Sequence, residues 1–167
     1  MSTDVSANDA NVEEREQPQP IAARLIVGFI AGFIGTITFH QGTLAWVYHE
    51  GLVDRAPWSL TPVPPLGVPA LVSLAFWGGV WGMALIFLLP RTPWRASYWV
   101  RAFLLGAILP SLVAWFLVAP LKGQPMLGGG QLAGIIMPLL LNGAWGLGTA
   151  LFIQILLGLH GRVWRAV

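Results

Sequence analysis

Residues 132–159 read LAGIIMPLLLNGAWGLGTALFIQILLGL and contain no aspartate, glutamate, lysine or arginine. A transmembrane helix needs about 20 consecutive, mostly apolar residues to cross a hydrocarbon core of about 30 Å. This stretch exceeds that length, and three similar stretches precede it, at residues 21–48, 66–89 and 98–119. Strands of a β-barrel would instead be short segments of alternating polarity. The sequence therefore predicts an all-α, polytopic membrane protein, a bundle of four transmembrane helices.

The composition excludes several other classes of protein. The chain has 167 residues, of which 56% are hydrophobic and only 10% are charged, and it contains no cysteine. Soluble domains carry about 25% charged residues, so this chain lacks the polar surface that water requires. Without cysteine, neither a disulfide framework nor a zinc finger is expected. The net charge of +2 does not suggest a nucleic-acid partner, and the expected partner is the lipid bilayer.

Charged residues separate two tails from a membrane domain. Residues 1–20 are polar and acidic and lack apolar periodicity, so we expect a disordered cytoplasmic tail. Residues 21–160 would form the four-helix domain, and residues 161–167 a short basic cytoplasmic tail. Lysine and arginine are enriched in cytoplasmic loops, and their distribution here predicts that both termini are cytoplasmic. The cytoplasmic side would carry Arg15, Arg24, Arg91, Arg95, Arg101, Arg162 and Arg165, and the other side only Arg55 and Lys122.

Glycines form two faces on which helices can approach closely. Gly28 and Gly32 are spaced as G-x-x-x-G in the first stretch, and Gly78 and Gly82 have the same spacing in the second. Lipid tails are as apolar as leucine, so membrane helices associate where small residues let their backbones touch. The four glycines therefore predict helix packing, either within the chain or with a second copy or a partner membrane protein.

A short match between the second and fourth stretches suggests a tandem repeat. Residues 79–82 read GVWG and residues 143–146 read GAWG. The first and third stretches also both begin with an arginine in the first turn. Two helical hairpins that each enter from the cytoplasm would explain these matches as a direct repeat. The alternative is chance similarity between helices rich in glycine and leucine.

Six polar side chains in the apolar stretches are candidates for a binding site. Polar groups in a membrane are costly unless they are paired, and an ionisable one suggests a function. His40 is the only ionisable side chain well inside any stretch, and α-helical spacing would place Thr36 and Thr43 on its face. The alternative is a structural imidazole that is hydrogen-bonded to Gln41 or to a threonine. The candidate binding residues are Thr36, His40, Gln41, Ser73, Ser111 and Asn142.

The connection between the first two stretches is stiff and apolar. Residues 56–65 read APWSLTPVPP, and their prolines favour an extended polyproline conformation. Such a segment could fold back over the outer end of the bundle or offer a surface to a partner. The alternative is a rigid connector that lies at the membrane surface.

Three segments carry a resemblance to a known group of proteins: Phe39–Gly42, Thr61–Pro69 and Ser73–Gly79. In these segments the chain resembles small, uncharacterised four-helix integral membrane proteins of proteobacteria. The resemblance covers roughly residues 22–160. It implies four helices in the bacterial inner (cytoplasmic) membrane and carries no known activity.

These features favour a non-enzymatic accessory or interaction subunit of a membrane assembly. The alternative is passage of a small solute or ion through a polar site around His40 and Asn142, near the helix prolines Pro110 and Pro138. A third hypothesis is an enzyme that acts on a lipid or a quinone. No histidine pair is spaced as metal ligands, and no nucleophile or phosphate motif is present. We therefore expect no catalytic residue, metal or cofactor.

Overall fold

Four long helices make up most of the structure. The computed structural model describes residues 20–89 and 95–163. The helices that are long and apolar enough to cross a membrane are Ile21–His49, Ala70–Leu88, Ala96–Leu121 and Leu132–Gly158. The predicted all-α class and the four predicted stretches are thus confirmed. Of the two predicted tails, only residues 20 and 161–163 fall within the described residues, and residues 161–163 continue the last helix.

The first long helix contains one wide turn. It consists of the α-helix α2 (Ile21–Gly35), the π-helix η2 (Thr36–His40) and the α-helix α3 (Gln41–His49). The hydroxyl of Thr36 donates a hydrogen bond to the Gly32 carbonyl at 2.9 Å, and the Trp145 indole donates to the same oxygen at 3.0 Å. Side chains that bond into the helical ladder are a known cause of such local distortion.

The remaining elements follow the expected order, with shifted ends. Helix α4 begins at residue 70, later than the expected residue 66, because residues 62–69 pair as a hairpin. Pro110 and Pro138 each lie within a helix that continues past the proline, so neither proline ends its helix. The elements are β1 (Pro62–Val63), β2 (Val68–Pro69), α4 (Ala70–Leu88), α5 (Ala96–Val113), η3 (Ala114–Val118), α6 (Ala119–Leu121), η4 (Met126–Gly130) and α7 (Leu132–Val163).

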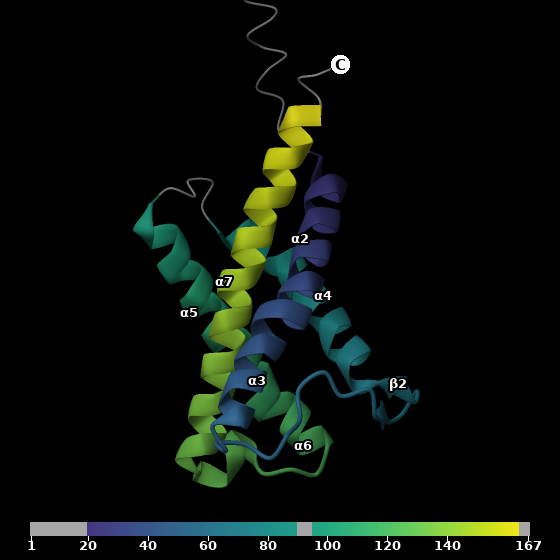
Figure 1. Cartoon of the computed structure of the whole chain (residues 1–167), viewed down its shortest axis with the longest axis vertical. Helices are drawn as coiled ribbons and strands as arrows, with labels where there is room; N and C mark the ends of the chain where they lie inside the picture. Colours follow the sequence, from purple (N-terminus) through teal and green to yellow (C-terminus); the bar gives the residue numbers. More distant parts are fainter. Residues whose placement is uncertain (1–19, 90–94, 164–167) are drawn as a thin grey trace, which may run out of the picture.

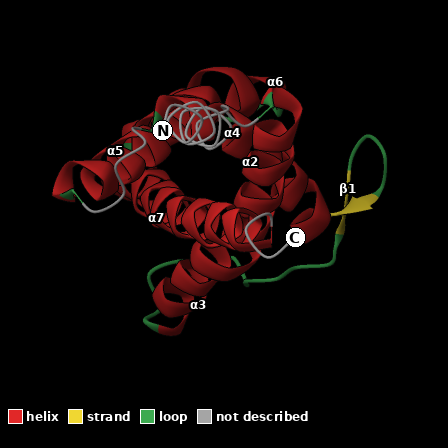
Figure 2. Cartoon of the chain, turned by 90° about the horizontal axis from the view of Figure 1, so that it is seen from above, coloured by secondary structure: helices red, strands yellow, loops and turns green. Residues whose placement is uncertain are grey.

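The helices form two antiparallel hairpins that meet along one seam. Helix α2 packs along α4, α5 packs along α7, and α2 and α7 join the two hairpins. The start of α2 and the end of α7 lie at one end of the bundle, and the loops after α3 and α6 lie at the other (Figure 1). Seen from above, the hairpin of β1 and β2 projects sideways beyond the helices (Figure 2).

Each hairpin is held together by the same glycine contact. A Cβ atom on Gly82 of α4 would lie 2.9 Å from the Cα atom of Gly32 in α2. In the second hairpin, a Cβ atom on Gly146 of α7 would lie 3.0 Å from the Cα atom of Gly106 in α5. Backbones this close leave no room for a larger side chain. The four glycines of the two predicted faces thus lie at a contact within the chain, between α2 and α4.

A second pair of equivalent contacts supports the repeat. Near the start of the first hairpin, the Arg24 guanidinium donates to the Ile86 carbonyl at 3.1 Å. At the corresponding positions of the second hairpin, the Tyr98 hydroxyl donates to the Ala150 carbonyl at 2.9 Å. Corresponding residues keep a constant offset in number within each pair of helices. The two hairpins therefore repeat one packing scheme with different side chains.

Large apolar side chains cover the outside of the bundle. On α5 alone, Val100, Leu104 and Ile108 are between 45% and 55% exposed. Contiguous apolar surface of this extent is rare on soluble monomers. These outer faces, together with the length of the four helices, support a multi-pass membrane protein.

Candidate functional site

The six candidate polar residues divide into separate groups. Thr36, His40 and Gln41 lie on the first long helix, where Gln41 contacts both the neighbouring His40 and the loop that follows α3. Ser111 and Asn142 pair between α5 and α7. Within the described residues, no hydrogen bond connects the two groups, and Ser73 takes part in no side-chain hydrogen bond.

Gln41 is the centre of the first group. Its side-chain oxygen accepts a hydrogen bond of 2.7 Å from the backbone N–H of Trp58. Because an N–H can only donate, this bond fixes which end of the amide faces the loop. The amide nitrogen then faces His40, 3.5 Å from its Nδ1 atom. Nδ1 can accept from this nitrogen only in the tautomer whose ring hydrogen is on Nε2, which is the structural role considered for this histidine.

The loop residue Trp58 binds the same helix a second time. Its indole N–H donates to the carbonyl of Ile37, inside η2, at 2.9 Å. A carbonyl within a wide turn is a favourable acceptor for an outside donor, because the regular helical bonding is disturbed there. Trp58 therefore fixes the loop to the first long helix through both its backbone and its side chain.

The next residues of the loop cap helix α4. The first N–H groups of an α-helix have no partner within the helix. The N–H of Ala70 donates to the Thr61 carbonyl, and the N–H of Leu71 donates to the Ser59 carbonyl, each at 2.9 Å. The loop thus connects the first long helix to α4 by hydrogen bonds at both sides. The hairpin of β1 and β2 projects sideways from the helices and does not lie over the end of the bundle (Figure 2).

Beyond these hydrogen bonds, the hairpin of β1 and β2 and the residues next to it expose apolar side chains. Leu66 is 83% exposed and Leu60 is 66% exposed, although both lie in a segment held by defined hydrogen bonds. Residues 56–69 contain no charged side chain. A fixed apolar protrusion of this kind differs from the polar loops usual at a protein surface. We refer to residues 58–69 as the outer hairpin, after the side of the membrane on which the arginine and lysine distribution predicts this loop.

The second polar group is a pair in the interface between α5 and α7. The side-chain amide of Asn142 donates to the Ser111 hydroxyl at 2.9 Å. Ser111 is fully buried. Hydrogen bonds of this type connect membrane helices and contribute roughly 1 kcal/mol. The pair is well suited to hold the second hairpin together.

Thr149 is a buried polar residue that the sequence analysis did not single out. It is 0% exposed and its hydroxyl has no hydrogen-bond partner among the described residues. A Cβ atom on Gly35 would lie 2.7 Å from this oxygen, so α2 passes very close to it. The hydroxyl can accept a weak Cα–H hydrogen bond at such a contact. Nothing in the sequence pattern separates Thr149 from the other small residues of its helix.

The loop tryptophan was the other residue that sequence reasoning missed. From the sequence, Trp58 is expected in a stiff connection and as an anchor at the outer membrane boundary, but its hydrogen bonds to the first long helix are not expected, because their partners lie far away along the chain. The contact of Trp58 with Ile37 needs an indole N–H and a carbonyl that a wide turn leaves available. The indole is visible in the sequence, but the wide turn is not.

No group of three His, Cys, Asp or Glu residues among the described residues could hold a metal ion. In comparisons with known proteins, neither a family model nor a curated protein nor a solved structure matches the chain.

Proposed function

We propose that the chain is a four-span protein of the bacterial inner membrane and serves as a non-enzymatic interaction subunit. In this proposal both termini are cytoplasmic, and the chain is of the same kind as the small proteobacterial proteins that its sequence resembles. The observation that carries the proposal is the outer hairpin, an uncharged, exposed apolar surface that hydrogen bonds hold in one position. Such a surface suits contact with an apolar surface of a partner protein at the outer face of the membrane.

Gln41 and His40, from the first polar group, have a defined role in this proposal. Gln41 and His40 act as positioning residues, because the Gln41 amide holds the backbone of Trp58 and thereby the hairpin that follows it. Passage of a solute through His40 and Asn142 has less support. These two side chains take part in separate contacts, His40 with the neighbouring Gln41 and Asn142 with Ser111 of α5.

A photo-reactive amino acid at Leu66 tests the proposal in native membranes. We expect illumination to produce one discrete protein adduct. Gln41→Leu should reduce the adduct severalfold, because it leaves the Trp58 N–H without a partner, at a cost of about 1–3 kcal/mol, and loosens the hairpin. Gln41→Glu retains the acceptor oxygen and should preserve the adduct.

The same photo-reactive residue at Gln124 provides a matched control. Gln124 is exposed and lies in the loop after α6, at the same end of the bundle. It should not give the adduct. Only lipid adducts at Leu66, or the same protein adduct from both positions, would contradict the interaction role.

A further inference from the structure

Pro138 leaves one carbonyl of α7 without its partner in the helix. In an α-helix each N–H donates to the carbonyl four residues earlier, but proline has no N–H. Pro138 lies inside α7, so the carbonyl of Gly134 loses its regular donor. In a helix surrounded by lipid, a neighbouring side chain has to supply another one. Residues 132–137, which we call the outer segment of α7, are therefore joined less firmly to the rest of the helix.

A tryptophan of the neighbouring helix supplies the missing donor. The indole N–H of Trp115, in η3, donates to the Gly134 carbonyl at 3.1 Å. Trp115 is buried, whereas the next two residues, Phe116 and Leu117, are more than half exposed. The preceding loop rests on the same glycine, because a Cβ atom on Gly134 would lie 2.7 Å from the Cα atom of Gly128 in η4. Gly134 thus connects the outer segment to both η3 and η4.

A second hydrogen bond joins the same two helices beyond the proline. The Asn142 amide donates to the Ser111 hydroxyl at 2.9 Å. Gly134 and Asn142 lie four residues before and four residues after Pro138. Their partners, Trp115 and Ser111, are also four residues apart, which is about one turn of a helix. The long helix that contains α5 and η3 therefore binds α7 on both sides of its proline.

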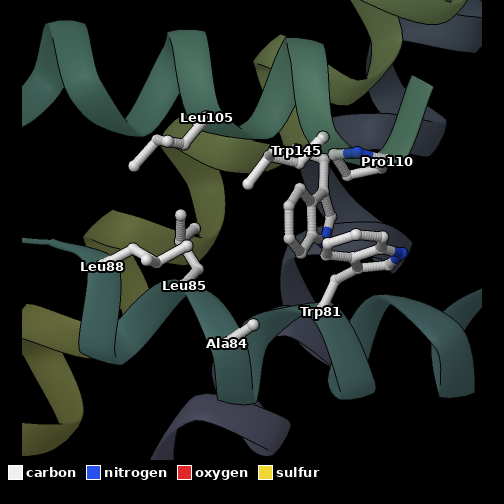
Figure 3. Close-up of a pocket in the computed structure, with 8 residues that line it drawn as sticks. Trp81, Ala84, Leu85, Leu88, Leu105, Pro110 and Trp145 are labelled. Carbon is white, nitrogen blue, oxygen red and sulfur yellow. The ribbon is translucent and has the colours of Figure 1, made fainter. Parts of the chain in front are cut away.

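A second helix proline lacks such a donor. Pro110 of α5 frees the carbonyl of Gly106, and no side chain among the described residues donates to it. Trp81 and Trp145 lie beside Pro110 (Figure 3). The Trp145 indole, however, donates to Gly32, and that of Trp81 has no hydrogen-bond partner in the described part of the chain. A tryptophan near a proline is therefore not sufficient, because the indole has to reach the freed carbonyl, as it does in η3.

We propose that the helix of α5 and η3 acts as a splint across Pro138, and that the Trp115 indole is the latch that keeps the outer segment of α7 in place. The bond between Asn142 and Ser111 fixes the helix after the proline, and the Trp115 bond fixes the segment before it. The outer segment then opens by itself when the latch is released, while the rest of α7 stays folded. This inference gives the second polar group a role that is independent of the proposed interaction role.

Amide hydrogen exchange, measured by NMR on the full chain in detergent micelles, tests the latch. In the unmodified chain, structure should protect the Ile135 amide of the outer segment at least tenfold less than the Ala150 amide, because local opening needs less free energy than global unfolding. Trp115→Phe keeps an aromatic ring but removes the donor, and should lower the protection of Ile135 about fivefold further. Trp81→Phe removes an indole that bonds to no carbonyl in the described residues, and should leave this protection unchanged.

Pro138→Ala separates the latch from the packing of the tryptophan ring. This substitution gives residue 138 an N–H that can donate to the Gly134 carbonyl within the helix. In the Pro138→Ala background, Trp115→Phe should therefore change the protection of Ile135 less than twofold. An equal loss in both backgrounds would overturn the proposal, since Trp115 would then act by packing alone. Equal protection of Ile135 and Ala150 in the unmodified chain would also overturn it, as would equal effects of Trp115→Phe and Trp81→Phe.

Discussion

Replacing Gly82 with leucine should lower the thermal unfolding midpoint of the detergent-solubilised protein by roughly 5–10 °C. A Cβ atom at this position would lie 2.9 Å from the Cα atom of Gly32 and closer still to the carbonyl oxygen of Gly28. Backbone atoms cannot move aside as a flexible side chain can. Helices α2 and α4 would therefore have to separate, and the first hairpin would lose its closest contact.

Gly42→Leu is the matched control for this substitution. Gly42 lies in α3, and a Cβ atom there would meet nothing within 4 Å. The same chemical change should therefore leave the unfolding midpoint within about 2 °C, since leucine also favours a helix over glycine. If Gly82→Leu unfolds at the same temperature as Gly42→Leu, the packing of α2 on α4 through glycine is incorrect.

Trp145→Ala should be the most destabilising truncation of a single tryptophan. Trp145 is only 4% exposed and its indole donates to the Gly32 carbonyl. Removal of a buried tryptophan costs about 3–5 kcal/mol. Trp81 occupies the corresponding position in the other hairpin but lies where α4 and α5 separate and is only half-buried. Trp81→Ala should therefore cost less than half as much.

Equilibrium unfolding of the two tryptophan variants, carried out in identical mixed micelles, measures the difference between their losses in the free energy of unfolding. Each variant removes the same atoms from an equivalent place in the repeat, so the comparison separates the packing of α2 on α7 from that of α4 on α5. Equal losses in the free energy of unfolding would contradict the closer packing of α2 on α7.

The number and type of the helices could be predicted because each stretch exceeds the length that a membrane requires. The glycine faces were also informative, since Gly32 and Gly82 do meet in the structure. The sequence shows the repeat at residues 79–82 and 143–146, whereas the expected match between arginines of the first and third stretches is wrong, because Arg24 corresponds to Tyr98 and not to Arg101. The structure extends it to Arg24 and Tyr98, whose side chains differ while their hydrogen bonds correspond.

The arrangement of polar residues beyond η2 could not be predicted from α-helical spacing. That spacing places Thr36, His40 and Thr43 on one face. The wide turn holds more residues per turn than an α-helix and so shifts the later positions around the axis: Thr36 and His40 are buried, while Leu44 takes an inward position and Thr43 is only half-buried. The Gly32 carbonyl beside this turn accepts a hydrogen bond from Trp145, which is more than one hundred residues away along the chain. No local pattern contains that information.

The orientation of the four helices in the membrane is the central claim, and labelling of single cysteines tests it most directly. The chain contains no native cysteine, so each substituted site can be read without background. In intact cells, an impermeant thiol reagent should label Ser59→Cys and Gln124→Cys. It should label Ser2→Cys and Ser97→Cys only after the membrane is permeabilised. Labelling of Ser97→Cys from outside in intact cells would contradict the account.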